Sequence, residues 1–191
     1  METLKTLCAK YKTSDFPDKD TTHSYIDVYQ EVLDIYRTRA KNILEIGLMS
    51  GESLRMWEEY FDGKVWGMDC SETPINGLAD LRPMIAEGGH NIIIGDATSQ
   101  VDIEKHFGAV LFDVIIDDAS HEINAQLKTY SIFKNYLAPN AIYIIEDIQD
   151  IDATADLFNK LDDQKDIIIL DRRSIKGRYD DVLVMIKNKL D

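Results

Sequence analysis

Cysteine is scarce in this sequence, and its scarcity excludes several classes of protein. Cys8 and Cys70 are the two cysteines among 191 residues, and they do not have the spacing of metal ligands. A disulfide-stapled scaffold needs several paired cysteines, and a structural zinc site needs clustered ones. Neither is expected here, and we interpret both side chains as ordinary thiols.

Long apolar runs are also absent. No run approaches the roughly 18 apolar residues that a helix needs to span a bilayer. The first five residues, Met-Glu-Thr-Leu-Lys, do not have the basic-then-apolar order of a signal peptide. We therefore expect a soluble, cytoplasmic protein that has no membrane partner.

Positive charge is in short supply. The chain has 21 Lys and Arg residues against 35 Asp and Glu residues, a formal net charge of -14. Binding to nucleic acid requires cations that neutralise phosphates, so we expect no nucleic-acid partner. The densest basic cluster is Arg172, Arg173, Lys176 and Arg178, which we interpret as a solvated loop, with a seat for a substrate phosphate as the alternative.

The length and composition fit one folded domain with a short N-terminal extension. With 191 residues and 45% hydrophobic content, the chain can bury a sizeable core. We expect a helical cap segment over residues 1–39 and a Rossmann-like domain over residues 40–191. We find no internal repeat, low-complexity tract or long linker.

Short apolar runs alternate with helical patterns along the chain. Continuous Ile/Val/Leu runs are typical of strands that helices cover on both faces, as in a parallel sheet. Helices are expected over 53–61, 76–87, 99–106, 123–137 and 153–161. Strands are expected over 42–47, 64–69, 91–95, 112–118, 141–147, 166–171 and 181–187. The link 172–180 is too short and polar for a crossover helix, so the last two strands should form an antiparallel pair. The fold class is therefore α/β: a seven-stranded, mostly parallel Rossmann-like sheet with one antiparallel strand, similar to the class I methyltransferase variant.

Glycines and acidic residues follow the first three expected strands. Gly47 and Gly51 form a turn before a helix with Ser53 in its first turn, where free N–H groups suit an anion or carboxylate. Asp69 ends the second strand, where a carboxylate can accept both ribose hydroxyls. Asp96 ends the third strand, where it can receive an adenine amino group. The alternative is that both aspartates only start turns.

Paired carboxylates end two further expected strands. Asp117 and Asp118 end one, with His121 just behind them, and Glu146 and Asp147 end the other. If the two strands are parallel neighbours, about 4.8 Å apart, these side chains converge at one edge of the sheet. Carboxylates that meet repel each other, and a divalent cation would offset that repulsion.

Four motifs are to be considered together: Leu44-Glu-Ile-Gly47, Gly51-Glu-Ser-Leu-Arg55-Met-Trp57, Asp117-Asp-Ala-Ser-His121 and Ile145-Glu-Asp147. Their combination resembles that of the metal-dependent S-adenosylmethionine O-methyltransferases that act on sugars of macrolides and related glycosides. The segment Asp18-Lys19-Asp-Thr-Thr-His23-Ser-Tyr25, followed by Tyr29, also resembles one that precedes the Rossmann domain in that family. The resemblance covers roughly residues 11–147.

The resemblance implies a role for each matching residue. It implies a divalent metal held by Asp118, Glu146 and Asp147. It also implies that His121 is the general base. Around S-adenosylmethionine it implies Glu45, Gly47, Gly51, Ser53, Asp69, Asp96, Ala97 and Asp117. For the acceptor it implies Lys19, His23, Tyr25 and Tyr29, although the four-residue spacing of the two tyrosines fits core packing on one helix face equally well.

Two positions depart from the family's pattern. Glu52 stands where relatives often have a second glycine, which bears on contacts to the methionine end of the cofactor. Ala119 stands where glycine is usual before Ser-His, which bears on the loop that places His121.

The chemistry of these residue types fits methyl transfer to a hydroxyl. The reaction needs in-line attack by an oxygen and removal of its proton. A divalent ion bound to a sugar hydroxyl lowers its pKa, so a neutral histidine can take the proton at pH 7. Three carboxylate ligands favour a hard ion, Mg²⁺ or Mn²⁺.

Other functions stay open at this point. The acceptor could be a catechol-like diol instead of a sugar, and a nucleotide-binding module without catalysis is a third interpretation. A nicotinamide-dependent oxidoreductase is disfavoured because the first turn lacks G-x-G-x-x-G. The sequence does not identify the acceptor or the oligomeric state, and it is compatible with a homo-oligomer.

Overall fold

The computed structural model describes residues 2–13, 17–73 and 80–189, and its centre is a seven-stranded sheet of order β3-β2-β1-β4-β5-β7-β6. β1 to β5 pair with their neighbours in parallel, whereas β7 runs antiparallel to β5 and β6. The predicted fold class is therefore confirmed. The strands are β1 (Asn42–Ile46), β2 (Lys64–Asp69), β3 (Asn91–Ile94), β4 (Phe112–Asp117), β5 (Leu137–Ile145), β6 (Lys165–Asp171) and β7 (Val182–Asn188).

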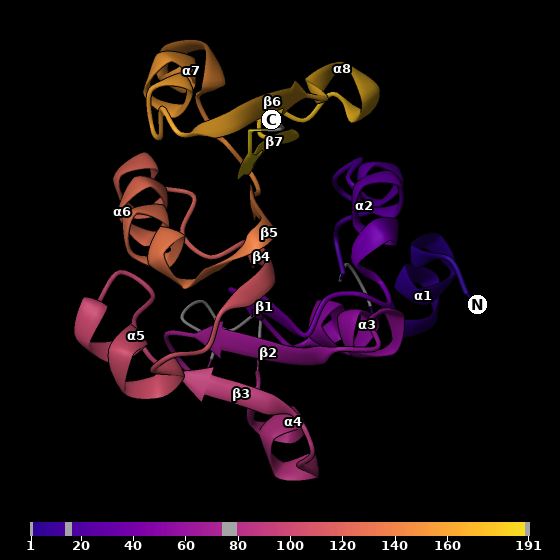
Figure 1. Cartoon of the computed structure of the whole chain (residues 1–191). Coiled ribbons are helices and arrows are strands. Elements are labelled where there is room, and N and C mark those ends of the chain that lie inside the picture. The colour runs from indigo at the N-terminus through magenta and orange to yellow at the C-terminus, as the bar shows by residue number, and fades with distance from the viewer. Residues whose placement is uncertain (1, 14–16, 74–79, 190–191) are drawn as a thin grey trace.

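Helices cover both faces of the sheet (Figure 1), with α1, α2 and α3 on one face and α5, α6 and α7 on the other. None of the helices in the described ranges is long and apolar enough to cross a membrane. The helices are α1 (Leu4–Tyr11), α2 (Ile26–Leu33), α3 (Glu52–Tyr60), α4 (Arg82–Glu87), α5 (Gln100–Phe107), α6 (Ile123–Phe133), α7 (Ile151–Asn159) and α8 (Arg173–Lys176), with 3-10 turns at Asp34–Tyr36 and Lys134–Tyr136.

Successive residues of each central strand bury into opposite layers. Ile43 packs with residues of α1, α2 and α3, whereas Leu44, the next residue, packs with residues of α5 and α6. Both side chains are completely buried. Because adjacent strand residues point to opposite faces, a strand covered on both sides must be apolar at every position. This requirement explains the continuous apolar runs in the sequence.

Two predicted element boundaries differ from the structure. We expected a helix over 123–137 and a strand from residue 141, but α6 ends at Phe133 and β5 already begins at Leu137. Pro139 explains the earlier change, because proline lacks the N–H that a helix interior needs and disfavours helical geometry in the residue before it.

Two other expectations concern segments near the sheet edges. The expected helix over 76–87 falls partly outside the described residues, and its described part starts at Arg82. The link 172–180 contains the four-residue helix α8, yet β6 and β7 still form the antiparallel pair that its length implied.

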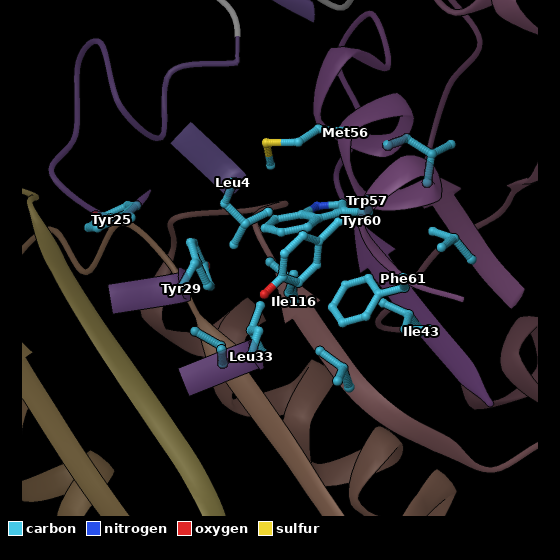
Figure 2. Packing of buried hydrophobic residues seen from close by; sticks show 14 of the residues in the cluster. Leu4, Tyr25, Tyr29, Leu33, Ile43, Met56, Trp57, Tyr60, Phe61 and Ile116 are labelled. Atoms are coloured by element: carbon cyan, nitrogen blue, oxygen red, sulfur yellow. The ribbon is translucent and has the colours of Figure 1, made fainter. Parts of the chain in front are cut away.

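The N-terminal segment packs into the same core as the sheet. Leu4 of α1 and Tyr29 of α2 lie near Trp57 of α3 (Figure 2), and all three side chains are fully buried. The rings of Tyr29 and Trp57 meet edge to face, with centroids 5.4 Å apart. The division into residues 1–39 and 40–191 stays a prediction, since both parts contribute to one hydrophobic cluster.

A glycine turn brings the ends of β1 and β4 together. Gly47 has a φ of +88°, and a Cβ atom at this position would lie 2.1 Å from the carbonyl oxygen of Asp118. The backbone N–H of Asp118 donates to the carbonyl of Ile46 at 2.8 Å, which continues the strand pairing to this point. Only a residue without a side chain allows this approach.

We predict that Gly47→Ala destabilises the fold through this clash. Left-handed geometry alone costs an L-residue about 1–2 kcal/mol, and overpacking adds about 1–3 kcal/mol. Gly88→Ala is the matched control, because Gly88 has a φ of +74° and a Cβ atom added there would meet nothing within 4 Å. Urea unfolding should show a clearly larger loss for Gly47→Ala. Equal losses in the two variants would contradict the close approach of β1 and β4.

Candidate functional site

The carboxyl ends of β1, β2, β3 and β4 surround a cavity of about 600 Å³, the larger cavity. Four residues predicted to bind the cofactor line it: Gly47, Asp69, Asp96 and Ala97. They come from three different strand ends, which the parallel sheet brings to one edge. The position and size are typical of ligand pockets in open α/β sheets.

The two aspartates at this cavity also organise their own turns. Asp69 accepts hydrogen bonds from the backbone N–H groups of Leu48 (2.8 Å) and Ser71 (3.1 Å). Asp96 accepts from the backbone N–H and the hydroxyl of Thr98, both at 2.8 Å. Turn formation and lining of the cavity therefore coexist, because each carboxylate oxygen has more than one acceptor position.

Three other residues predicted at the cofactor line neither cavity in the described part of the chain: Glu45, Gly51 and Asp117. Glu45 is completely buried and accepts hydrogen bonds from Trp57 Nε1 and Ser53 Oγ, both at 2.9 Å. Burial raises its pKa to about 7. Asp117 accepts from the Tyr143 hydroxyl at 2.7 Å, and burial likewise raises its pKa to about 7. The carboxylates of Glu45 and Asp117 are therefore buried behind the residues that line the two cavities.

A smaller cavity of about 180 Å³ adjoins the larger one. The two cavities share a wall formed by Gly47, Leu48, Met49, Asp118 and Ala119. Apart from Pro17, its remaining lining residues carry polar or charged side chains: Asp18, Lys19, Glu52, Ser53, His121 and Asp147. A group bound there would lie directly beside a ligand of the larger cavity.

Asp118, His121 and Asp147 meet in the smaller cavity, and their potential ligand atoms lie within 4.8 Å of one another. His121 Nε2 lies 3.8 Å from Asp118 Oδ1 and 3.6 Å from Asp147 Oδ2. Its pairing with Asp118 and the charge of Asp147 raise the pKa of His121 to about 8. Burial and the charge of Asp118 raise the pKa of Asp147 to about 7. Asp147 also has a φ of +56°, a strained geometry that is often found at functional positions.

Glu146, the third predicted metal ligand, lies beside this group but outside it. Its Oε1 accepts hydrogen bonds from Lys19 Nζ at 2.5 Å and from the Tyr29 hydroxyl at 2.6 Å. In the described residues, two sets of carboxylate and imidazole groups bring their ligand atoms within 4.8 Å of one another, Asp118–His121–Asp147 and Asp18–His23–Asp147, and neither contains Glu146. The set Asp118, Glu146 and Asp147 stays a prediction.

The residues predicted to bind the acceptor lie among these carboxylates. Lys19 lines the smaller cavity, whereas His23, Tyr25 and Tyr29 line neither cavity and are at most 2% exposed. Tyr25 donates to Asp147 Oδ1 at 2.7 Å. The rings of both tyrosines therefore pack in the core, while their hydroxyls bind carboxylates of the site. Contact with an acceptor stays a prediction.

Sequence reasoning missed Asp18, whose carboxylate lies 3.7 Å from His23 Nε2 and forms a second acidic group with His23 and Asp147. It also missed Gln126, which donates to the backbone carbonyl of Glu146 at 3.1 Å. Asp18 directly precedes Lys19 in a motif that was recognised, so it could have been found. Gln126 is the fourth residue of α6 and has no comparable signal.

The basic cluster near the C-terminus is engaged in internal contacts. Arg172 donates to Ser24 Oγ, and Arg178 forms two hydrogen bonds with Asp180. Arg173 pairs with Asp152 and Asp171 in the same way. Lys176 donates to three backbone carbonyls of the N-terminal segment. These contacts favour a structural role for the cluster over a role as a binding site for a substrate phosphate.

Comparison with known proteins identifies relatives that act on glycosides. The chain is 31% identical over 141 residues to the 8-demethyl-8-alpha-L-rhamnosyl tetracenomycin-C 2'-O-methyltransferase of Streptomyces olivaceus, a match that covers 69% of this chain and 35% of that protein. It is 30% identical over 154 residues to the mycinamicin VI 2''-O-methyltransferase of Micromonospora griseorubida, over 76% of this chain and 36% of that protein. The chain thus spans about a third of the length of these curated relatives. No family model matches it.

The fold has close counterparts among solved structures. The MycE methyltransferase from the mycinamycin biosynthetic pathway, in complex with Mg, SAH and mycinamycin VI, superposes with a TM-score of 0.68. The superposition covers 98% of this chain and 54% of that one, at 20% sequence identity. At this identity the likeness concerns the fold.

Proposed function

The chain belongs to the class I S-adenosylmethionine O-methyltransferase family whose members include the glycoside-modifying enzymes above, and from this premise we propose that it methylates a hydroxyl of a sugar or glycoside with the help of a divalent metal. The observation that carries the proposal is the pair of adjoining cavities. The larger suits a nucleoside cofactor, and the smaller holds carboxylates and a histidine next to it. Their shared wall would bring the methyl donor and the acceptor together.

The larger cavity supports binding of S-adenosylmethionine, which supplies an electrophilic methyl group. Asp69 lies where a carboxylate can accept both ribose hydroxyls. Asp96 and Ala97 line the part of the cavity after β3, where the adenine would lie. Gly47 lines both cavities, and because it has no side chain the ends of β1 and β4 can approach each other at the shared wall.

The smaller cavity offers donors that fit a hard divalent ion. Asp118 and Asp147 present carboxylate oxygens, with Glu146 beside them, and such oxygens suit Mg²⁺ or Mn²⁺. Burial and the neighbouring charge of Asp118 both raise the pKa of Asp147, so its ionised form is disfavoured without a cation. A bound ion would supply positive charge and would lower the pKa of an acceptor hydroxyl.

His121 is well placed to act as the general base. About a third of its side chain is exposed, and it lines the smaller cavity. In its neutral form the imidazole can accept the proton of an acceptor hydroxyl, while Asp118 and Asp147 stabilise the imidazolium that results. Such a base next to a cofactor cavity disfavours a nucleotide-binding module without catalysis.

The lining of the smaller cavity favours a sugar over a catechol. Asp18, Glu52 and Ser53 add polar groups to the carboxylates, and no aromatic side chain apart from the His121 imidazole is among the described lining residues. Sugar hydroxyls need several hydrogen-bonding partners, whereas an aromatic diol would favour an apolar slot. The two relatives described above also act on sugars of natural products.

We predict that Asp69→Ala weakens binding of S-adenosylhomocysteine by at least about tenfold, equivalent to about 1.4 kcal/mol, because the ribose hydroxyls lose their acceptor. Titration calorimetry measures the affinity. Asp156→Ala is the control, since Asp156 is exposed on α7 and lines neither cavity. An unchanged affinity in Asp69→Ala, or tight NAD binding without any response to S-adenosylhomocysteine, would refute the cofactor assignment.

We predict that methyl transfer requires a divalent ion. Labelled methyl transfer from S-adenosylmethionine should be measured with a panel of rhamnosides, glycosylated macrolides, nucleotide sugars and catechols. Exhaustive treatment with EDTA should abolish transfer, and Mg²⁺ or Mn²⁺ should restore it. Full activity after chelation would remove the metal from the proposal, and methylation of catechols alone would replace the sugar as acceptor.

We predict that His121→Ala lowers kcat by about 10² to 10⁴, the usual cost of losing a general base, with little change in affinity for S-adenosylhomocysteine. The control is His90→Ala, because His90 pairs with Glu58 and lines neither cavity. If His121→Ala keeps kcat and loses only affinity for the acceptor, His121 positions the sugar and another group takes the proton.

A further inference from the structure

Three side chains of the N-terminal segment donate to the carboxylates that follow β4 and β5. Lys19 Nζ donates to Asp118 Oδ2 at 2.9 Å and to Glu146 Oε1 at 2.5 Å. The Tyr29 hydroxyl donates to Glu146 Oε1 at 2.6 Å, and the Tyr25 hydroxyl donates to Asp147 Oδ1 at 2.7 Å. Lys19, Tyr25 and Tyr29, the N-terminal donors, therefore reach all three predicted metal ligands.

In Asp118 and in Asp147, an N-terminal donor binds one carboxylate oxygen, and the other oxygen faces His121. Asp118 directs Oδ2 to Lys19, and its Oδ1 lies on the side of His121. Asp147 directs Oδ1 to Tyr25, and its Oδ2 lies on the side of His121. In each aspartate, one oxygen is held by the N-terminal segment and the other faces the same histidine.

The contacts of Glu146 follow the same pattern. Lys19 and Tyr29 both bind its Oε1, so Oε2 lies outside these two contacts. Two donors on one oxygen restrict rotation of the carboxylate about its last bond. The N-terminal donors thereby hold one oxygen of each carboxylate, and in Asp118 and Asp147, which line the smaller cavity, they select the oxygen that faces His121.

The N-terminal donors are themselves held from two sides. The ring of Tyr29 packs against Trp57 and that of Tyr25 against Tyr29, in the cluster that Figure 2 shows. From the other side, Lys176 donates to the backbone carbonyl of His23 at 2.7 Å. The carboxylate of Asp181 accepts from the backbone N–H and hydroxyl of Ser24 at 2.9 and 2.7 Å. These contacts fix the segment on both sides of Tyr25.

Resting on the metal-dependent function proposed above, we propose that Lys19, Tyr25 and Tyr29 are positioning residues for the metal ligands and not contacts to the acceptor. Partners that hold the far side of a ligand carboxylate orient it and raise the affinity for the ion. Both tyrosines are completely buried and line neither cavity, which fits this role. Lys19 adds charge compensation, since its ammonium also lies 3.7 Å from Glu45 Oε1.

The positive charge of one ammonium does not neutralise this cluster of carboxylates. Three carboxylates, those of Glu45, Asp118 and Glu146, lie within 3.7 Å of the Lys19 ammonium, so its single charge offsets only part of theirs. The remaining negative charge attracts a cation to the His121 side. Lys19 and the ion should therefore act together on opposite oxygens of Asp118.

Removal of single hydroxyl groups tests the proposal. Tyr25→Phe and Tyr29→Phe delete one donor each and keep the ring that packs in the core. Tyr130→Phe is the matched control, because Tyr130 is also completely buried and donates to a carboxylate, that of Asp162 at 3.0 Å, on the opposite face of the sheet. Binding of Mn²⁺ is measured by electron paramagnetic resonance, binding of S-adenosylhomocysteine by calorimetry, and folding by thermal melting.

We expect each of Tyr25→Phe and Tyr29→Phe to weaken Mn²⁺ binding at least about tenfold, the usual effect of losing such a partner. Affinity for S-adenosylhomocysteine should stay within about twofold, and Tyr130→Phe should leave Mn²⁺ binding unchanged. Wild-type Mn²⁺ affinity in both tyrosine variants would overturn this inference alone. If the wild-type protein binds no Mn²⁺ at all, the metal in the proposed function fails, and this inference fails with it.

Lys19→Met separates positioning from competition. If the ammonium orients the carboxylates, Mn²⁺ binding should weaken about tenfold or more in this variant as well. Tighter Mn²⁺ binding would show that the ammonium competes with the ion, and it would overturn the role given to Lys19. If Lys19→Met does not fold, the two tyrosine variants decide the proposal.

Discussion

The buried ion pairs of Lys19 are the interaction on which the arrangement of the site depends. Its ammonium lies 2.5 Å from Glu146 and 2.9 Å from Asp118, and its side chain is 1% exposed. Although burial opposes it, the charges of these carboxylates raise the pKa of Lys19 well above its ordinary value. A charge buried without a partner is strongly unfavourable. The strand-end carboxylates and the N-terminal segment therefore require each other.

The topology of the sheet determines where this cluster can lie. The strand order β3-β2-β1-β4-β5 reverses direction between β1 and β4, and crevices open at such switch points. Gly47 follows β1 and Asp118 follows β4, and the two approach each other closely because Gly47 has no side chain. This approach forms the wall that the two cavities share, so the proposed cofactor and acceptor sites meet at one place in the fold.

Much of the site could be predicted because its signals are local. Gly47, Asp69 and Asp96 follow apolar strands directly, and parallel pairing brings all such positions to one edge of the sheet. Glu45 carries a similar signal but lies behind the site. It precedes the end of β1, so its side chain points into the layer of α3, where Trp57 and Ser53 bind it.

The sequence by itself determined the fold class, the strand ends and the residue types that gather there, because apolar periodicity and turn chemistry act over a few neighbouring residues. The tertiary structure alone decided how those groups pair. Lys19 and Glu146 are 127 positions apart in the chain, and Tyr25 meets Asp147 across 122 positions. The packing of helices against the sheet decides which oxygen of a carboxylate faces a buried donor and which faces the cavity. Local sequence patterns do not predict that packing.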